Sequence, residues 1–405
     1  MNQNIHTPEG VRDIWGREYA ARLRAEGRIR DVFHRYGYQG IRTPSFEFFD
    51  VFSREKGSAA SRDLFKFFDR DGETMVLRPD MTPAIARFAA REFAEGGLPM
   101  RLSYIENMFI NRTSLQGRLK EFTQAGAELL DDGSADADAE ILALTIECLL
   151  ACGLTDFQLE VGHVGFLQGL FAEAGLPAET EEIICGLLEN KNYFGVEEQL
   201  ARSGMNADMQ GLFARLPAFF DSDDQLKEAA SLPVGAGARQ AIERLQDVYR
   251  ILGCYGLEKY VSFDLGMVGG YRYYNGMIFR GYTYGSGEPV VTGGRYDNLM
   301  EQFGRKAKAV GFAIVLDSVM AALSRQRIDM DIPRPQALIL YVPGWMERAI
   351  ELACRLRRDG DEVRLQRIEN IPDDTQKEYY RSYAASQGFE RLILYAGEGL
   401  QEERL

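Results

Sequence analysis

The stretch from Gly269 to Leu299 constrains the fold more than any other part of the chain, because it predicts strands joined by glycine turns. Residues 277–284, MIFRGYTY, alternate bulky residues with small or polar ones, as a strand with two different faces does. The cluster GSGEP follows as a turn, and Gly293-Gly294 allows close backbone approach. Composition alone favours a glycine-rich meander whose tyrosines are half-buried core: Tyr273, Tyr274, Tyr282, Tyr284 and Tyr296.

Length and composition predict a globular protein of more than one domain. The 405 residues suffice for two or three domains, and 45% hydrophobic with 27% charged residues is an ordinary mixture. The sequence has no apolar run of about 18 residues and no secretory signal, so we expect no membrane span and a cytoplasmic location. Five scattered cysteines predict reduced thiols, and three distant histidines predict no metal site.

The charge balance bears on partners. The net charge is −14, whereas a protein that grips tRNA needs a basic surface facing the phosphates. The longest basic cluster, Arg355 to Arg358, fits the solvated end of a helix. We therefore expect no tRNA binding.

Two segments of the first half carry candidate binding residues. Residues 65–77 predict a hairpin with an Asp-Gly turn, and RPDMTP then leads into a helix with Thr82 as N-cap and a proline at its first position. In the segment EFTQAGAELL, Gln124 and Glu128 lie four residues apart, which places both on one face of a strand. Without reference to any protein family, Gln124 and Glu128 are equally well interpreted as two ordinary polar residues of a strand.

The segments YYNGMIFRGY and GGRYDNL resemble the histidine-binding signature of histidyl-tRNA synthetases and their non-synthetase paralogs. RPDMTP occupies the place of the synthetases' Arg-Pro-Glu-Gly-Thr, and the resemblance covers nearly the whole chain in the same order. It implies an α+β fold with a class II aminoacyl-tRNA synthetase-like antiparallel sheet flanked by helices. The implied core spans residues 1–330 with a helical insertion at about 167–257, and residues 331–405 resemble a shortened anticodon-binding domain with three strands.

The same resemblance implies a histidine-binding pocket. Carboxylates and hydroxyls suit this role, because an ammonium group in a desolvated site needs opposite charge and acceptors. Arg118 would hold the ligand's carboxylate in place of the synthetase arginines. The implied histidine-binding residues are Asp80, Thr82, Arg118, Gln124, Glu128, Tyr273, Tyr274 and Tyr296.

Three positions depart from the synthetase pattern. Where the synthetases carry arginines that serve ATP and catalysis, this chain has Ile110, Gly269 and Ser318. None of these side chains carries a charge, so none can anchor a phosphate as arginine does. The pattern implies a chain without catalytic residues, bound metal or cofactor.

This combination is similar to the regulatory subunits of ATP phosphoribosyltransferase. The resemblance implies a partner, the short-form catalytic subunit, together with a homodimer through the class II core. It also implies that L-histidine is the effector that inhibits the first step of histidine biosynthesis. Two alternatives stay open from the sequence: an active histidyl-tRNA synthetase, and a synthetase-like tRNA-binding module.

Overall fold

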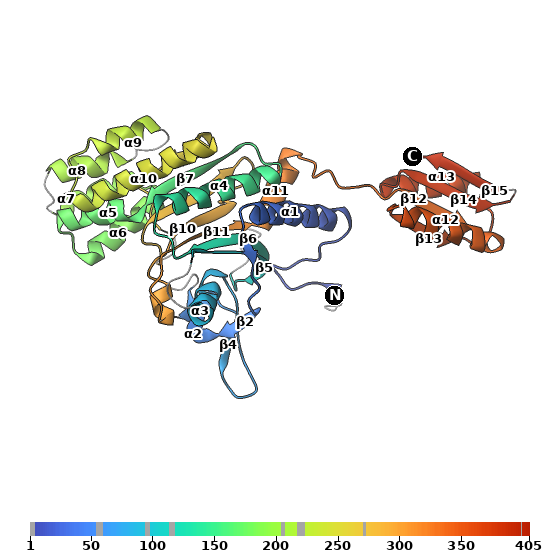
Figure 1. Cartoon of the computed structure of the whole chain (residues 1–405), viewed down its shortest axis with the longest axis horizontal. Helices are drawn as coiled ribbons and strands as arrows, with labels where there is room; N and C mark the ends of the chain where they lie inside the picture. Colours follow the sequence, from blue (N-terminus) through green and yellow to red (C-terminus); the bar gives the residue numbers. More distant parts are fainter. Residues whose placement is uncertain are drawn as a thin grey trace. The chain divides into compact units, whose positions relative to one another are not determined.

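The structure is a computed structural model that describes residues 5–53, 60–93, 98–112, 118–203, 207–216, 223–269, 273–397 and 399–405. Contacts between residues divide the chain into two compact units, Met1–Met330 and Asp331–Leu405 (Figure 1). Each unit contains a sheet of its own.

An eight-stranded sheet forms the centre of the first unit. Two neighbouring pairs, β1 with β5 and β7 with β8, are parallel, and the other neighbours are antiparallel. The predicted α+β class with a mainly antiparallel sheet is confirmed. In spatial order the strands are β1 (Gln39–Gly40), β5 (Met100–Phe109), β6 (Glu121–Leu130), β11 (Ala309–Val315), β10 (Val291–Arg295), β9 (Met277–Thr283), β7 (Phe157–His163) and β8 (Val261–Phe263).

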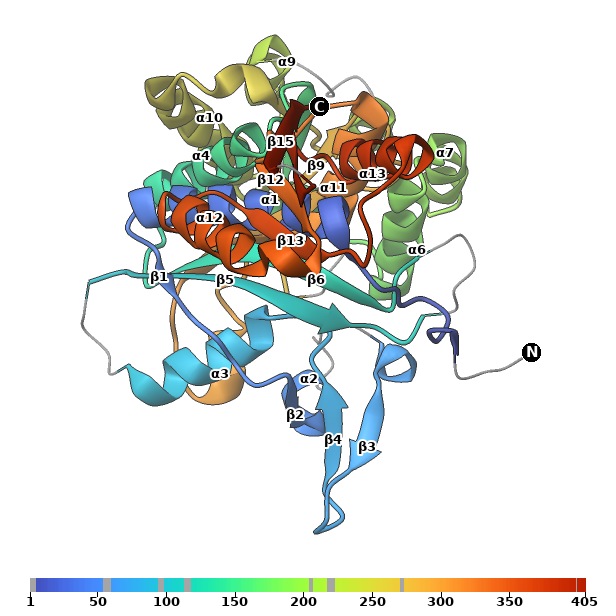
Figure 2. The same ribbon diagram turned by 90° about the vertical axis from the view of Figure 1, so that its right-hand side faces the viewer.

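The two faces of this sheet carry different helices. Helices α1 (Gly16–Arg35) and α4 (Ala135–Ala151) pack against each other on one face (Figures 1 and 2). There the ring of Phe33 lies 6.2 Å from that of Phe312. On the other face, Ile85 of α3 (Thr82–Glu92) packs with Tyr104 of β5. Because side chains alternate along a strand, β6 directs Gln124 and Glu128 to the α3 face.

A three-stranded sheet precedes α3, in the order β2 (Phe46–Phe48), β4 (Thr74–Leu77) and β3 (Lys66–Phe68), with α2 (Phe49–Ser53) and the 3₁₀ turn Ser61–Asp63 beside it. Its β3–β4 hairpin, visible in Figure 2, turns at Gly72 with φ +87°, as the Asp-Gly pair predicts. The prediction that Thr82 caps α3 is wrong, because Thr82 is already helical. Instead, the Asp80 carboxylate accepts a hydrogen bond of 2.7 Å from the Met81 N–H, just before the helix.

Helices fill most of the chain between β7 and β8. The half-buried imidazole of His163 accepts a hydrogen bond from the Gly165 N–H at the start of α5, and desolvation lowers the pKa of His163 to about 4. This histidine is therefore a neutral helix cap. The helices are α5 (Val164–Ala174), α6 (Ala178–Glu189), α7 (Tyr193–Arg202), α8 (Ala207–Ala214), α9 (Asp223–Ala230) and α10 (Ala236–Tyr255).

The first unit closes with α11 (Leu316–Gln326), and short 3₁₀ turns lie at Glu258–Tyr260 and Met300–Phe303. Cys148 and Cys152 are free and buried. Nowhere in the described ranges is a helix both long enough and apolar enough to cross a membrane. The same ranges contain no cluster of three or more histidine, cysteine or acidic side chains placed to hold a metal ion.

The second unit is a four-stranded sheet with a helix on each face. It contains β12 (Ala337–Tyr341), the 3₁₀ turn Pro343–Trp345, α12 (Met346–Arg358), β13 (Val363–Arg367), α13 (Asp374–Ser386), β14 (Arg391–Ala396) and β15 (Gly399–Arg404). The strand order is β13-β12-β14-β15, and only β15 runs antiparallel to its neighbour. The prediction of three strands in this unit is wrong, because β15 forms a fourth strand at the edge of the sheet. Its polar sequence GLQEER lacks the apolar pattern that predicts a strand, and Gly397 (φ +58°) helps the chain to reverse direction before it.

Candidate functional site

Seven of the eight residues expected to bind histidine converge on the α3 face of the large sheet. They come from the start of α3, from β6, from the segment before β9 and from the residue that follows β10. The backbone and side chains of β10 and β11 close the remaining walls. The cavity is lined by Asp80, Thr82, Gln124, Glu128, Tyr273, Tyr274 and Tyr296, together with Thr292, Gly311, Phe312 and Ala313.

Glu128 is the most buried acidic group of this cavity, with 1% of its surface exposed. Its carboxylate accepts hydrogen bonds from the Thr82 hydroxyl (2.7 Å) and from the Tyr296 hydroxyl. Burial raises the pKa of Glu128 to about 8, the neighbouring Asp80 carboxylate acts in the same direction, and the two hydroxyls offset part of the rise. Glu128 is thus a largely protonated acid near neutral pH in a site without ligand.

Hydrogen bonds hold the Asp80 carboxylate at the edge of the same cavity. One carboxylate oxygen accepts from the Met81 N–H, and the other accepts from the Tyr273 hydroxyl at 3.3 Å. The Tyr273 ring packs edge-on against Tyr274 and Tyr296, with centroid distances of 4.9 and 5.8 Å. The tyrosines therefore position both carboxylates through hydroxyls and ring contacts.

The cavity has an acceptor that is not satisfied. Within the described part of the chain, the side-chain oxygen Oε1 of Gln124 is buried and has no hydrogen-bond donor. Buried polar atoms of this kind usually have a partner, so the amide fits a site that receives an N–H group from a ligand. The cavity itself measures only about 10 Å³, which is room for one water molecule, so an amino acid needs side chains to move aside.

Gly311 contributes to the cavity by having no side chain, which the sequence reasoning missed. A Cβ atom at this position would lie 1.7 Å from Oε2 of Glu128. The glycine therefore leaves the space into which the Glu128 carboxylate projects. A glycine inside the apolar strand sequence AVGFAIV was the available signal, because such glycines mark close approach.

Arg118 does not join the other predicted residues. It lines a separate cleft and forms an ion pair with Glu288, so the expectation that it holds the ligand's carboxylate is not supported by the geometry. The structure also shows the surroundings of the three positions that lack the synthetase arginines. Ile110 packs against the apolar cluster below α3, Gly269 is half-buried, and Ser318 lines the cleft that contains Arg118.

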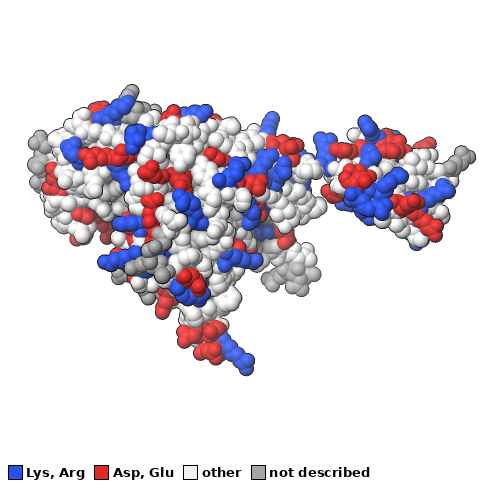
Figure 3. Space-filling model, viewed as in Figure 1, with Lys and Arg blue, Asp and Glu red and all other residues white. Residues whose placement is uncertain are grey.

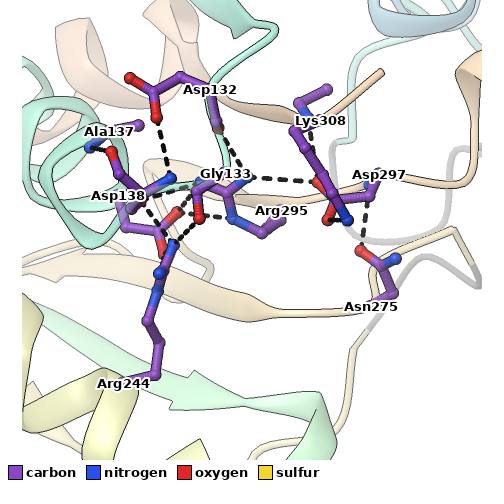
Figure 4. A network of polar contacts seen from close by, with 11 residues as sticks. Asp132, Gly133, Ala137, Asp138, Arg244, Asn275, Arg295, Asp297 and Lys308 are labelled. Atoms are coloured by element: carbon purple, nitrogen blue, oxygen red, sulfur yellow. Dashed lines mark hydrogen bonds and ion pairs between the residues drawn. The ribbon is translucent and has the colours of Figure 1, made fainter. Parts of the chain in front are cut away.

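A buried network of charges braces the strand that leads to Tyr296 (Figure 4). Arg295 donates to Oδ1 of Asp138 from Nε (2.9 Å) and from Nη2 (2.6 Å). Arg244 of α10 donates from Nε to the other oxygen of Asp138 at 2.8 Å. Asp138 thereby joins α4, α10 and β10, and sequence reasoning assigned none of these three residues to the site.

The network also reaches the segment that carries Tyr273 and Tyr274. The Asn275 N–H donates to the Arg295 carbonyl (2.9 Å), and the Asn275 side-chain oxygen accepts from the Asp297 N–H (3.0 Å). In Figure 4, dashed lines join Asp297 both to Arg295 and to Asn275. Hydrogen bonds therefore connect the segment that carries the cavity's tyrosines to helix α10 through Arg295 and Asp138.

Comparisons with known proteins identify a family for this chain. A model described as histidyl-tRNA synthetase matches residues 10–319. The ATP phosphoribosyltransferase regulatory subunit of Acetivibrio thermocellus is 41% identical over 356 residues, which cover 88% of this chain and 85% of that protein. The subunit of the same name from Ruminiclostridium cellulolyticum is 38% identical over 389 residues, 96% of this chain and 92% of that protein.

The chain belongs to the ATP phosphoribosyltransferase regulatory subunit family. A crystal structure of an ATP phosphoribosyltransferase regulatory subunit/histidyl-tRNA synthetase from Bacillus halodurans C matches with a TM-score of 0.86 and 30% identity. That match covers 98% of this chain and 99% of the other. Histidyl-tRNA synthetase from a Nostoc species matches with a TM-score of 0.81 at 20% identity, which shows the shared fold. The resemblance drawn from the sequence is confirmed.

Proposed function

We propose that this chain is the non-catalytic regulatory subunit of ATP phosphoribosyltransferase and that L-histidine binds in the cavity around Glu128. The observation that carries the proposal is the convergence of seven predicted side chains from separate segments on that one cavity. The family membership supports the regulatory role. The partner is the short-form catalytic subunit, in a complex that makes N1-(5-phospho-β-D-ribosyl)-ATP.

The polar groups of the cavity suit a cationic amine better than an anion. Glu128 and Asp80 supply two carboxylates, and Gln124 supplies an amide oxygen without a donor. The ammonium group of an amino acid supplies charge and donors for the carboxylates, and an imidazole N–H supplies a donor for the amide. Histidine offers both groups.

The absence of catalysis follows from the three uncharged positions. Removing one preorganised electrostatic anchor costs on the order of 10²–10³ in rate, and this chain lacks three of the arginines that the synthetases use. A ligand that binds without reacting regulates a partner only if it prefers one conformational state of the complex. Histidine binding to this chain and inhibition of the catalytic subunit are then two sides of one coupling, in a cytoplasmic assembly built on a homodimer of the class II core.

The decisive experiment co-purifies this chain with the short-form catalytic subunit and measures product formation with and without histidine. We expect activation by the chain and inhibition by histidine. In calorimetric titrations, Glu128→Ala should weaken histidine binding at least about tenfold, because the ammonium loses its buried partner. The matched control is Glu243→Ala, an exposed glutamate on α10. Equal histidine affinity in the Glu128 variant and the control would contradict the proposed site.

The rival functions have direct assays. Histidine-dependent exchange of pyrophosphate into ATP would identify an active synthetase and overturn the regulatory proposal. A gel shift with tRNA would support a tRNA-binding module. On the face drawn in Figure 3, basic and acidic side chains are interspersed, which disfavours a continuous phosphate-binding surface there.

A further inference from the structure

The four-stranded sheet of the second unit is wider than the helix on one of its faces. Neighbouring strands lie about 4.8 Å apart, whereas a helix with its side chains is about 10–12 Å across. Helix α12 packs over β12 and β13. A groove of about 470 Å³ opens beside it, where the sheet continues into β14 and β15. We call this space the α12 groove, and its largely apolar lining is formed by Leu352, Leu356, Ile393, Tyr395 and Leu400.

The floor of the α12 groove presents apolar surface to solvent. Tyr395 of β14 lies opposite Leu400 of β15, and Leu400 is 47% exposed. The ring of Trp345, just before α12, lies 5.7 Å from the ring of Tyr395, measured between centroids. Contiguous exposed apolar surface with a polar rim is typical of an interaction site.

Three arginines line the α12 groove, and one of them is already neutralised. Arg391 pairs with Asp361 at 3.1 Å and with Glu402 at 3.4 Å. Arg348 and Arg355 are both exposed. In the part of the chain that the structure describes, neither of these two arginines forms an ion pair. The groove therefore carries two uncompensated positive charges.

The spacing of these two arginines fits one stripe of helix α12. Arg348 and Arg355 are seven residues apart, which is two turns or about 10 Å along the axis, and Leu352 lies between them on the same side. Arg348 also lies over the Trp345 ring, with 5.1 Å between its guanidinium carbon and the ring centroid. Because the ring carries no net charge, this contact orients the guanidinium group without neutralising it.

The opposite face of the same sheet has a different charge pattern. A groove of about 360 Å³ beside α13 is lined by Lys377 and Arg381. Arg381 pairs with Glu378 at 2.6 Å and with Glu403 at 2.7 Å, and Lys377 lies 3.8 Å from Asp374. The cations of that groove are thus compensated within the unit, whereas Arg348 and Arg355 of the α12 groove are available to a partner.

We propose that the α12 groove binds an amphipathic helix of a partner protein, with two acidic residues seven positions apart and leucine or aromatic residues between them. A helix has the width to cover β14 and β15 beside α12, and its seven-residue spacing matches that of Arg348 and Arg355. Hydrogen bonds between guanidinium and carboxylate groups set the register of the bound helix. Burial of the apolar floor supplies the larger part of the affinity.

The experiment titrates the full chain with two labelled peptides of about 18 residues, long enough to form a helix. One carries glutamate at two positions seven apart with leucines between them, and the other carries lysine at the same two positions. Fluorescence anisotropy measures the dissociation constants. We expect the glutamate peptide to bind at least about tenfold more tightly than the lysine peptide, and this preference to shrink as salt rises.

The test variant reverses both charges, Arg348→Glu with Arg355→Glu. The control, Arg334→Glu with Arg358→Glu, changes two exposed arginines of the same unit and has the same net charge. We expect the test variant to lose at least about tenfold in affinity for the glutamate peptide and to prefer the lysine peptide instead. The control should keep the original preference. A purely structural role of the two arginines cannot produce this reversal.

The apolar floor has a test of its own, because Leu400→Ser changes an exposed side chain. We expect this variant to weaken binding of the glutamate peptide at least about threefold. Thermal unfolding checks the fold of every variant, and Arg355→Glu alone serves if the double variant is unstable. Absence of peptide binding, equal affinity for both peptides, or the same change in test and control variants would overturn the proposal.

Two other occupants are also distinguished. A single-stranded RNA that binds more tightly than the glutamate peptide and is lost in the test variant would overturn the proposal in favour of nucleic acid. Self-association of the chain that the test variant abolishes would overturn it in favour of a second copy. The peptide titration requires neither histidine nor the catalytic subunit, so its failure is distinguishable from failure of the proposed regulatory function.

Discussion

At the scale of single residues, Glu128 decides how the cavity responds to pH. Its pKa in the folded chain, about 8, lies above the usual value of 4.5. Between these two values the folded chain holds a proton that the unfolded chain has lost, so the free energy of unfolding falls as pH rises through that window. Below pH 8 the Glu128 carboxyl group is mostly protonated, and a cation bound beside it would favour its charged form.

Histidine binding is expected to release a proton from Glu128. An ammonium group beside the carboxylate favours its charged form and lowers its pKa, so up to about one proton leaves at pH 7.5. Calorimetry in buffers of different ionisation enthalpy measures the number released. Glu128→Gln should abolish the release, whereas Glu243→Gln should retain it. Proton uptake, or release that persists in the Glu128→Gln variant, would contradict this account.

The residues of the cavity show what local sequence can and cannot specify. Gln124 and Glu128 were predictable as neighbours because a strand repeats every two residues. Arg118 was expected in the cavity, but it pairs with Glu288, which lies 170 positions further along the chain. The periodicity of local sequence gives no information about contacts over such a distance. The fit of Gly311 against the Glu128 carboxylate likewise depends on the pairing of β6 with β11.

At the scale of elements, the buried Asp138 connects three parts of the fold that sequence patterns treat separately. Individual helices, strands and the β3–β4 hairpin could be predicted, because local signals such as the Asp-Gly turn mark them in the sequence. The charge network could not be predicted in this way, because Arg295, Arg244 and Asp138 belong to elements that meet only in the folded chain. The edge strand β15 escaped prediction for a related reason, since it is polar and depends on pairing with β14.

Replacing Asp138 by asparagine should destabilise the first unit strongly. Asp138 is fully buried, and both Arg295 and Arg244 pair with it. Breaking a buried ion pair by removing one partner costs about 3–5 kcal/mol, because a charge remains buried without compensation. Urea denaturation of Asp138→Asn measures the loss. The control is Asp136→Asn, an exposed aspartate in the first turn of the same helix, for which we expect a change within about 0.5 kcal/mol.

At the scale of the whole molecule, the two units differ in how much of the function they carry. The cavity and the charge network both lie within residues 1–330, and the family model ends at residue 319. The second unit has apolar clusters on both faces of its sheet, represented by Leu338 and Ile339. These clusters contain residues of the second unit only, so its core is complete without the first.

Residues 331–405 should therefore fold when expressed alone, although about 75 residues bury a modest core and the stability will be low. Circular dichroism should show a cooperative thermal transition. Ile339→Asp should abolish it, because a charge would replace a side chain with 0% exposure. Glu351→Asp, an exposed change on α12, should preserve the cooperative transition.

Residues 1–330 expressed alone should keep the histidine affinity of the full chain, since every cavity residue lies there. Loss of that affinity would mean that the second unit supports the cavity.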